Sequence, residues 1–313
     1  MESPGKVAVT KVRIGAEEAG QRLDNYLFRR LKGVPKSRVY RMLREGEVRI
    51  SGRRAKPDYK LEEGDEVRIP PVRVAAREEI PALPGIGQPL LERVIYSDDS
   101  LLVIDKPPGQ AVHGGSGVSL GIIEQLRLEL PDARFLELAH RLDKETSGVL
   151  ILALKRSALV ELHRMLRLGE TRKTYLTLAK GPWRDPVRHV KLALHKYLNE
   201  EGERRVVANA DGQRAHTIFR LVRQAGDYAL LEAELKTGRT HQIRVHLASI
   251  GHPIAGDDKY GDFELNRALK KRGLKRMFLH AQRLEMAHPL TGKPLCLEAP
   301  LPRDLDAFLG GLG

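Results

Sequence analysis

The sequence contains a single cysteine, Cys296, among 313 residues. An internal disulfide is therefore excluded, and so is a zinc site built from several thiolates. Long apolar runs are missing too, because the longest, residues 149–154, is far shorter than the roughly 20 residues that a membrane-spanning helix needs. The first residues, MESPGKVAV, contain no apolar signal core. We therefore expect a cytoplasmic protein with no membrane partner.

Motifs of the common nucleotide and metal sites are missing as well. Neither GxGxxG nor GxxxxGKS/T can be drawn through the glycines between residues 114 and 121. The 11 histidines include no HExxH, and the five-residue spacing of His241 and His246 does not place them on one helical face. Isolated histidines are more often hydrogen-bonded structural groups. The sequence thus predicts no cofactor and no metal.

Acidic residues are scarce relative to basic ones. The chain has 54 Lys and Arg against 41 Asp and Glu, a net charge of +13, with a pI of about 9.8. Such an excess of cations is costly in self-repulsion unless a polyanion is near, so RNA or DNA is the leading partner. An anionic membrane surface comes second, and a merely basic soluble enzyme stays possible on charge alone.

The excess is concentrated near the N-terminus. Residues 21–60 hold 13 Lys and Arg against 4 Asp and Glu, a local excess of +9. So few acids compensate these cations that phosphate contact is favoured over a solvated helix face. The candidate phosphate contacts are Lys36, Arg38, Arg41, Arg44, Arg53 and Arg54.

Periodicity divides the chain into a small domain, a linker and a larger domain. Apolar residues at helical spacing mark two helices around residues 23–31 and 39–43, and short strands follow at 48–50 and 67–69. Five prolines and two glycines between residues 70 and 89 leave little room for a helix or a central strand. We predict a small α+β domain over residues 18–75, a linker over 76–89 and a second domain over 90–305.

The second domain has the pattern of strands with some helices. Hairpins are predicted from 91–96 with 101–105 and from 217–223 with 228–235, and further strands at 149–154 and 173–179. Ser157 is predicted to cap one helix, and Thr240 to cap a shorter one that ends at Gly251 and carries Arg244 beside its apolar stripe. The predicted class is α+β, with a mixed, mainly antiparallel sheet.

One polar stretch lies directly before the apolar strand at 149–154. It reads HRLDKETSG and covers residues 140–148. Polar groups at the mouth of a strand are where a scaffold usually presents chemistry. On spacing alone, a salt-bridged structural loop is an equally good interpretation.

Stretches in both predicted domains resemble known families. The pieces QRLDNYL, VPKSRVYRMLREGEVRI and YKLEEGDEVRI, within residues 18–70, resemble the S4 RNA-binding domain. HRLDKETSG resembles the central motif of the RluA-type pseudouridine synthases, and other motifs of that family occur in the same order. They are IDKPPGQAVH (104–113), RKTYLTL (172–178), LKTGRTHQIRVHLASIGHPIAGDDKYG (235–261) and FLHAQRLEMAHPLTGK (278–293).

The resemblance implies an activity, a substrate and four site residues. It implies that the chain isomerises specific uridines in large-subunit (23S) ribosomal RNA to pseudouridine without a cofactor, and we expect it to act as a monomer. Asp143 matches the nucleophile, which attacks either the ribose or the uracil ring. Arg244 matches its guanidinium partner and Tyr175 the active-site tyrosine. Arg141 matches an arginine that holds the RNA with the base out of the stack.

Two other functions stay open from the sequence. An RNA-binding assembly factor without catalysis would also need an S4-like domain and the basic charge, and a closed pocket around Asp143 would favour it. A uridine N-glycosidase would use the same carboxylate but release the base, so that free uracil would be its product.

Overall fold

The computed structural model describes residues 9–72 except 17, 32–33 and 35, residues 89–200 except 115–119, and residues 202–312. The chain divides into two compact units, Met1–Gly87 and Gln88–Gly313. Most of the linker predicted over residues 76–89 lies outside the described residues. In the part of the chain that is described, no helix has both the length and the apolar character needed to cross a membrane.

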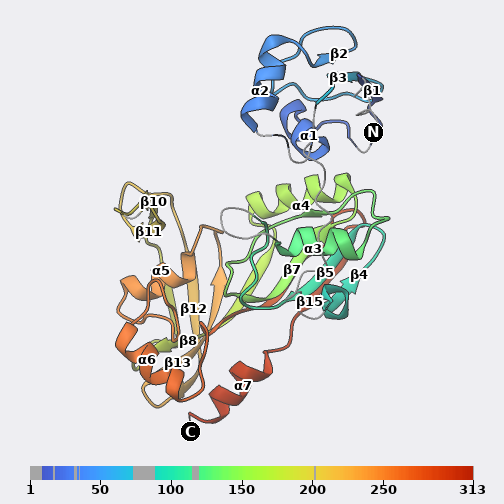
Figure 1. Cartoon of the computed structure of the whole chain (residues 1–313). Helices are drawn as coiled ribbons and strands as arrows, with labels where there is room; N and C mark the ends of the chain where they lie inside the picture. Colours follow the sequence, from blue (N-terminus) through green and yellow to red (C-terminus); the bar gives the residue numbers. More distant parts are fainter. Residues whose placement is uncertain are drawn as a thin grey trace, which may run out of the picture. The chain divides into compact units, whose positions relative to one another are not determined.

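The N-terminal unit packs two helices on a small antiparallel sheet with the order β1-β3-β2 (Figure 1). Its elements are β1 (Thr10–Arg13), α1 (Leu23–Arg30), α2 (Lys36–Glu45), β2 (Arg49–Ile50) and β3 (Glu66–Ile69). Leu23 and Leu27 of α1 pack with Val39 and Met42 of α2 in one buried cluster. The predicted helical spacing is confirmed there, whereas β1 precedes the predicted start of the domain at residue 18.

Ten strands of the C-terminal unit form one sheet with the order β4-β5-β7-β14-β8-β13-β12-β9, to which β15 adds on β14 and β6 on β7. The strands are β4 (Val94–Ser97), β5 (Leu101–Lys106), β6 (Glu137–Leu138), β7 (Ser147–Ala153), β8 (Arg172–Lys180), β9 (Val187–Val190), β12 (Thr217–Ala225), β13 (Tyr228–Leu235), β14 (Leu279–Ala287) and β15 (Pro294–Glu298). A separate hairpin consists of β10 (Leu194–Leu198) and β11 (Arg204–Ala208). All described pairings in the large sheet are antiparallel except β14 with β7, which confirms the predicted mixed, mainly antiparallel sheet.

Helices cover both faces of this sheet. They are η1 (Leu90–Arg93), α3 (Ile122–Glu129), α4 (Arg156–Leu168), α5 (Gln242–Ser249), α6 (Phe263–Lys271) and α7 (Arg303–Gly310). Side chains alternate along β5 and β7, so that Leu102 packs in a cluster with α3 and α5 while Val103 packs in another with α4. Leu178 of β8 faces α6 and α7, and Tyr175 belongs to the cluster on the α5 side. The side chain of Tyr175 is thereby placed beneath α5.

Two predicted helix caps are wrong. Lys155 holds the N-cap position of α4, and Ser157 lies inside the helix. Thr240 does not cap α5, because the N-cap position falls on His241, whose φ is 53°. Neither of these two N-cap residues makes a side-chain hydrogen bond to its helix, so no capping signal in the sequence could mark these starts. Gly251 follows the end of α5 with φ 83°, as the sequence predicts.

Candidate active site

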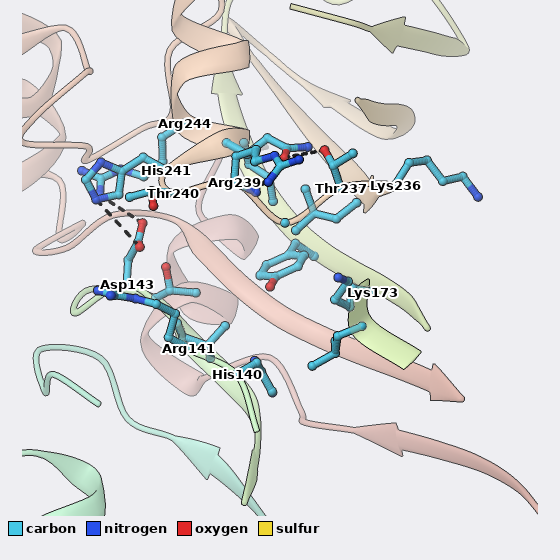
Figure 2. A pocket seen from close by; sticks show the side chains of 18 of the residues that line it. His140, Arg141, Asp143, Lys173, Lys236, Thr237, Arg239, Thr240, His241 and Arg244 are labelled. Atoms are coloured by element: carbon cyan, nitrogen blue, oxygen red, sulfur yellow. Dashed lines mark hydrogen bonds and ion pairs between the residues drawn. The ribbon is translucent and has the colours of Figure 1, made fainter. Parts of the chain in front are cut away.

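A pocket of about 570 Å³ lies in the C-terminal unit, between the loop before β7, strand β8 and the start of α5. Asp143, Arg141, Tyr175 and Arg244 all line it, although more than 100 residues separate the first and last of them along the chain. Figure 2 shows Asp143 and Arg244 facing one another on one side of the pocket and Lys173 on the other. The fold therefore brings together all four residues that the family resemblance implies.

The turn that carries Asp143 is hydrogen-bonded to the end of strand β5 and to the residues that follow it. The ammonium of Lys106 donates hydrogen bonds to the carbonyls of Pro107, at 2.7 Å, and Lys144, at 3.0 Å. The Gly109 N–H donates to the same Lys144 carbonyl at 2.9 Å. Lys106 is fully buried, and burial lowers its pKa to about 7. The backbone next to Asp143 is thus tied to a rigid strand, which limits where the carboxylate can lie.

The start of β7 is fixed by a glycine that has no room for a side chain. Gly148 has φ 111°, and a Cβ built on it would lie 2.2 Å from the carbonyl oxygen of Ala281. This close approach is where β7 pairs in parallel with β14, with His280 opposite Ser147 and Ala281 opposite Gly148. The pairing places the start of β14 beside the turn that carries Asp143.

Arg244 is the cationic partner of Asp143. Its Nη1 donates to Oδ2 of Asp143 at 3.2 Å, and the Arg244 side chain is only 7% exposed against 20% for Asp143. Its Nε and Nη2 donate to the two carboxylate oxygens of Asp257, each at 2.8 Å. The guanidinium is therefore held in a bidentate pair by one carboxylate while its remaining nitrogen faces the other.

Electrostatics keep Arg244 and Asp257 ionised. Burial works to lower the pKa of Arg244, but the hydrogen bonds and charge of Asp257 and the charge of Asp143 raise it above its ordinary value. Burial works to raise the pKa of Asp257, yet the bonds from Arg244 lower it. Backbone N–H groups of Lys259 and Tyr260 also donate to Asp257, at 2.8 Å and 3.0 Å. The charge that Asp143 faces is accordingly permanent across the physiological pH range.

Tyr175 on β8 contributes a ring and a protonated hydroxyl. Its side chain is 9% exposed and packs among the buried residues beneath α5. Burial, and then the charge of Asp143, raise its pKa above the ordinary value for tyrosine. The hydroxyl therefore keeps its proton at neutral pH, and the ring offers a flat apolar surface to a base in the pocket.

Arg141 lies two residues before Asp143 and has an exposed side chain at the pocket. Unlike Arg244, it has no carboxylate of the described residues within ion-pair distance. An exposed guanidinium at a pocket mouth suits a contact to RNA phosphate or to a base rather than a structural role.

The sequence analysis did not single out four residues that line the pocket or bond to a pocket residue. His140 accepts a hydrogen bond from the Ile151 N–H at 3.1 Å, and burial lowers its pKa to about 4. Lys173 lines the pocket on the face of β8 that also presents Tyr175, and burial lowers its pKa. His241 and Asp257 lie within the motif at residues 235–261. All four residues lie inside the family motifs, which is the signal that could have identified them. Residue spacing by itself gives none of them a role.

Metal ligation finds no support in the described residues. They contain no group of three or more His, Cys, Asp or Glu side chains placed to hold a metal ion. Several histidines bond instead to neighbouring groups of the fold. His246, for example, pairs its Nδ1 with the Thr217 hydroxyl at 2.9 Å and its Nε2 with the Leu192 carbonyl at 2.9 Å.

The six basic residues predicted to contact phosphate differ in their surroundings. Three have exposed side chains with no carboxylate within ion-pair distance in the described part of the unit: Arg41, Arg44 and Arg53. Arg54 is exposed and donates to the Glu45 carbonyl at 3.4 Å. Arg38 is half-buried in a two-bond pair with Glu47, at 3.1 Å and 3.0 Å, which competes with phosphate. Helix α2 begins at Lys36, whose side chain is outside the described set.

Comparison with known proteins agrees with both resemblances. Residues 100–249 match the family model described as RNA pseudouridylate synthase, and residues 21–67 match that of the S4 domain. Ribosomal large subunit pseudouridine synthase C of Escherichia coli (strain K12) is 51% identical over 306 residues, which cover 96% of each chain. The enzyme of the same name from Pasteurella multocida (strain Pm70) is 48% identical over 307 residues, 97% of this chain and 94% of that one.

Solved structures share the fold of the C-terminal unit. Human RNA Pseudouridylate Synthase Domain Containing 4 has a TM-score of 0.60 and 28% identity, covering 71% of this chain and 94% of that chain. Human RNA Pseudouridylate Synthase Domain Containing 1 has a TM-score of 0.57 and 26% identity, covering 69% of this chain and 86% of that chain.

Proposed function

The chain belongs to the RNA pseudouridylate synthase family and is an RNA pseudouridine synthase, and on this premise we propose that it isomerises uridines of large-subunit ribosomal RNA with Asp143 as the nucleophile. The observation that carries the assignment of Asp143 is its position in an open pocket, 3.2 Å from a buried guanidinium that a second carboxylate holds in place. A carboxylate oriented by a fixed cation in such a pocket is a competent nucleophile.

The reaction is an isomerisation with no net redox change. The bond between ribose C1′ and uracil N1 breaks, the base turns within the pocket, and a bond forms between C1′ and C5. The proton on C5 is released and N1 gains one, so atoms and electrons balance without a cofactor. Asp143 forms a transient ester with the ribose or an adduct with the ring, and it is regenerated when the new bond forms.

Arg244 and Asp257 have distinct roles in this scheme. Arg244 neutralises the charge of Asp143 before attack and orients one of its oxygens. Asp257 fixes the plane of the guanidinium through two bonds, so the remaining nitrogen does not reorganise during reaction. The buried pair thus supplies preorganisation rather than new chemistry.

Tyr175 and Arg141 handle the base and the RNA. The Tyr175 ring stacks on the extruded uracil, and its protonated hydroxyl is available to move a proton as the base is detached. Extruding a base costs a few kcal/mol, least where it is already unpaired. The exposed Arg141 guanidinium offsets part of that cost by holding the RNA with the base out of the stack.

The substrate assignment rests on the relatives and on the N-terminal unit. Relatives about half identical over nearly the whole chain are named for the ribosomal large subunit. The S4 match falls on residues 21–67, where the cationic excess lies, and its exposed Arg41, Arg44 and Arg53 are free to meet phosphates. We extend the RNA contact to Lys36, Arg38 and Arg54, with Arg38 the weakest candidate because of its pair with Glu47.

We further propose that the enzyme acts as a monomer in the cytoplasm. The residues of one chain suffice to bring Asp143, Tyr175 and Arg244 into one pocket. Cys296 is free and exposed, which suits a reducing compartment.

The substrate is tested by mapping pseudouridine across ribosomal RNA from a strain that lacks the gene. We expect defined large-subunit uridines to lose the modification and to regain it when the gene is restored. An unchanged map would contradict the substrate assignment. Incubating the purified enzyme with large-subunit RNA separates isomerisation from N-glycosidase chemistry, since free uracil would appear only in the second case.

A further inference from the structure

His241 lies at the edge of the pocket in an unusual backbone conformation. It has φ 53° and ψ 22°, in the left-handed region that few residues other than glycine adopt, although histidine does so more often than most. Such a conformation costs energy and persists where the surrounding structure requires it, often at functional sites. Its ring nitrogens face two different groups, Tyr260 on one side and Asp143 on the other. Figure 2 shows the ring beside the Asp143 carboxylate.

The surroundings of the Tyr260 hydroxyl favour one direction for its hydrogen bond with His241. The Tyr260 hydroxyl oxygen accepts a hydrogen bond from the Val206 N–H at 3.1 Å and lies 2.8 Å from Nδ1 of His241. Burial raises the pKa of Tyr260, so the hydroxyl keeps its single proton. Nδ1 is the acceptor that lies within reach of this O–H among the described residues, so donation toward Nδ1 is the arrangement that pairs the hydroxyl proton. In that arrangement Nδ1 is the acceptor nitrogen of the ring.

The tautomer of His241 follows from this bond. A neutral imidazole that accepts at Nδ1 carries its proton on Nε2. Burial lowers the pKa of His241 in spite of the opposing charge of Asp143, which keeps the ring neutral at pH 7. Nε2 faces Oδ1 of Asp143 at 3.8 Å, while Arg244 bonds the other oxygen, Oδ2, at 3.2 Å. His241 and Arg244 thus face different oxygens of the Asp143 carboxylate.

We propose that Tyr260 and His241 are positioning residues for the nucleophile: Tyr260 fixes the imidazole with its proton on Nε2, and this N–H orients Oδ1 of Asp143. The proposal rests on the assignment of Asp143 as nucleophile. The separation of 3.8 Å is longer than a hydrogen bond, and catalytic hydrogen bonds commonly tighten only when substrate is bound. His241 is then a hydrogen-bond donor and not the base that removes the C5 proton, because the nitrogen facing the pocket is already protonated.

The β10–β11 hairpin takes part in this arrangement. Val206 belongs to β11, and Arg205 beside it donates to the Lys259 carbonyl at 3.0 Å. Lys259 in turn donates to Glu203 at 2.6 Å. The hairpin therefore holds the loop that carries Tyr260. Through Tyr260 it fixes the orientation of the His241 imidazole.

Two substitutions at residue 241 separate positioning from a backbone role. In His241→Gln the side-chain amide reaches about as far as Nε2 and retains a donor, whereas in His241→Asn the amide reaches only as far as Nδ1. Asn tolerates the left-handed region better than Gln does. If His241 matters only for the backbone, His241→Asn should therefore be the more active variant. If His241 positions Asp143, His241→Gln should be the more active variant. We expect the saturating single-turnover rate on a large-subunit RNA fragment to fall on the order of 10²-fold in His241→Asn and only a few-fold in His241→Gln.

A mutant cycle tests whether Tyr260 acts through His241. Tyr260→Phe should slow the single-turnover rate of the wild-type enzyme but not slow His241→Asn further. RNA affinity should be unchanged in all variants. Equal rates for Asn and Gln, or additive losses with Tyr260→Phe, would overturn the proposal.

A spectroscopic measurement needs no activity. In protein with ¹⁵N-labelled histidine, the resonances absent from His241→Gln identify His241, and their shifts report which ring nitrogen is protonated. We expect protonation at Nε2 alone at pH 7, and a proton on Nδ1 would contradict the proposal. Absence of any pseudouridine formation by the wild-type enzyme would instead contradict the proposed function and leave the tautomer result standing.

Discussion

Arg244 donates hydrogen bonds to two carboxylates with different parts of one planar guanidinium. Asp257 receives two bonds and Asp143 receives one. A lysine ammonium in the same place keeps the charge but cannot serve both in fixed directions. The function of Arg244 at the residue scale is therefore geometric as much as electrostatic.

We predict that Arg244→Lys slows single-turnover isomerisation by roughly 10²-fold although charge is retained. The matched control is Arg220→Lys, because Arg220 also bonds two carboxylates, Glu232 and Glu234 on β13, but does not line the pocket. Both variants are measured at a temperature where circular dichroism shows them folded. Near-wild-type turnover by Arg244→Lys would remove Arg244 as the partner of Asp143.

We predict that the protein loses stability at acidic pH because His140 is buried in its neutral form. Burial lowers its pKa to about 4, below an ordinary value of 6.5. The unfolded chain thus binds a proton between pH 6.5 and 4 that the folded chain does not, and the stability from neutral His140 is lost as pH falls through that window. The scale is about 1.4 kcal/mol per pH unit.

The measurement is denaturant unfolding of the C-terminal unit at pH 7 and pH 5. His140→Gln is the comparison, because its amide oxygen can accept from the Ile151 N–H without titrating. Wild type should lose about 1–2 kcal/mol more than the variant between the two pH values. Parallel losses would show that His140 does not set the acid response.

The sequence identifies some of the pocket residues and misses others. Asp143, Arg141, Tyr175 and Arg244 follow from motif resemblance, and all four line one pocket. The role of His241 does not follow, because it depends on an unusual φ and on a tyrosine 19 residues away. Single-sequence patterns carry no signal for either feature.

At the scale of elements, alternation and turns predict most of the strands in the large sheet. Both predicted hairpins, β4–β5 and β12–β13, are present, but residues 91–93 of the first predicted strand belong to η1 instead. The parallel pairing of β14 with β7 was not predicted, since about 130 residues separate the partners and no local pattern links them. Hairpin β10–β11 was missed because most of its residues are exposed and no apolar period marks it.

That parallel pairing supplies a test at Gly148. We predict that Gly148→Ala destabilises the C-terminal unit by about 1–3 kcal/mol, because the new Cβ collides with the Ala281 carbonyl, and that it slows the chemistry by displacing the Asp143 turn. Gly273→Ala is the control, because Gly273, shortly after α6, has φ 104° and nothing lies within 4 Å of its Cβ. The control measures the backbone cost at a similar φ without the collision. Equal effects at both positions, by thermal unfolding and turnover, would refute the collision argument.

On the scale of the whole molecule, the cationic excess and the candidate active site lie in different parts of the chain. The excess of +9, from 13 Lys and Arg against 4 Asp and Glu, lies in residues 21–60, whereas the pocket is built from residues 140–279. The sequence predicts this division by charge and by the proline-rich stretch.

We predict that removing residues 1–87 weakens capture of large RNA but leaves the chemical step unchanged. Each phosphate contact on a single strand contributes about 0.7 to the logarithmic salt slope, so the truncated enzyme should show a shallower slope. Salt-titrated binding and saturating single-turnover rates are compared on one ribosomal RNA fragment. An unchanged slope would exclude an RNA-docking role for the N-terminal unit, and a collapsed rate in a folded C-terminal unit would show that the pocket is not self-contained.

The central claim is that Asp143 is the nucleophile. The most direct test is tritium release from large-subunit RNA labelled at C5 of uridine, with Asp143→Asn compared with wild type. Asn keeps the shape of the side chain but has no nucleophilic oxyanion. The account predicts no release by the variant, together with RNA affinity close to that of wild type. Substantial tritium release by Asp143→Asn would contradict it.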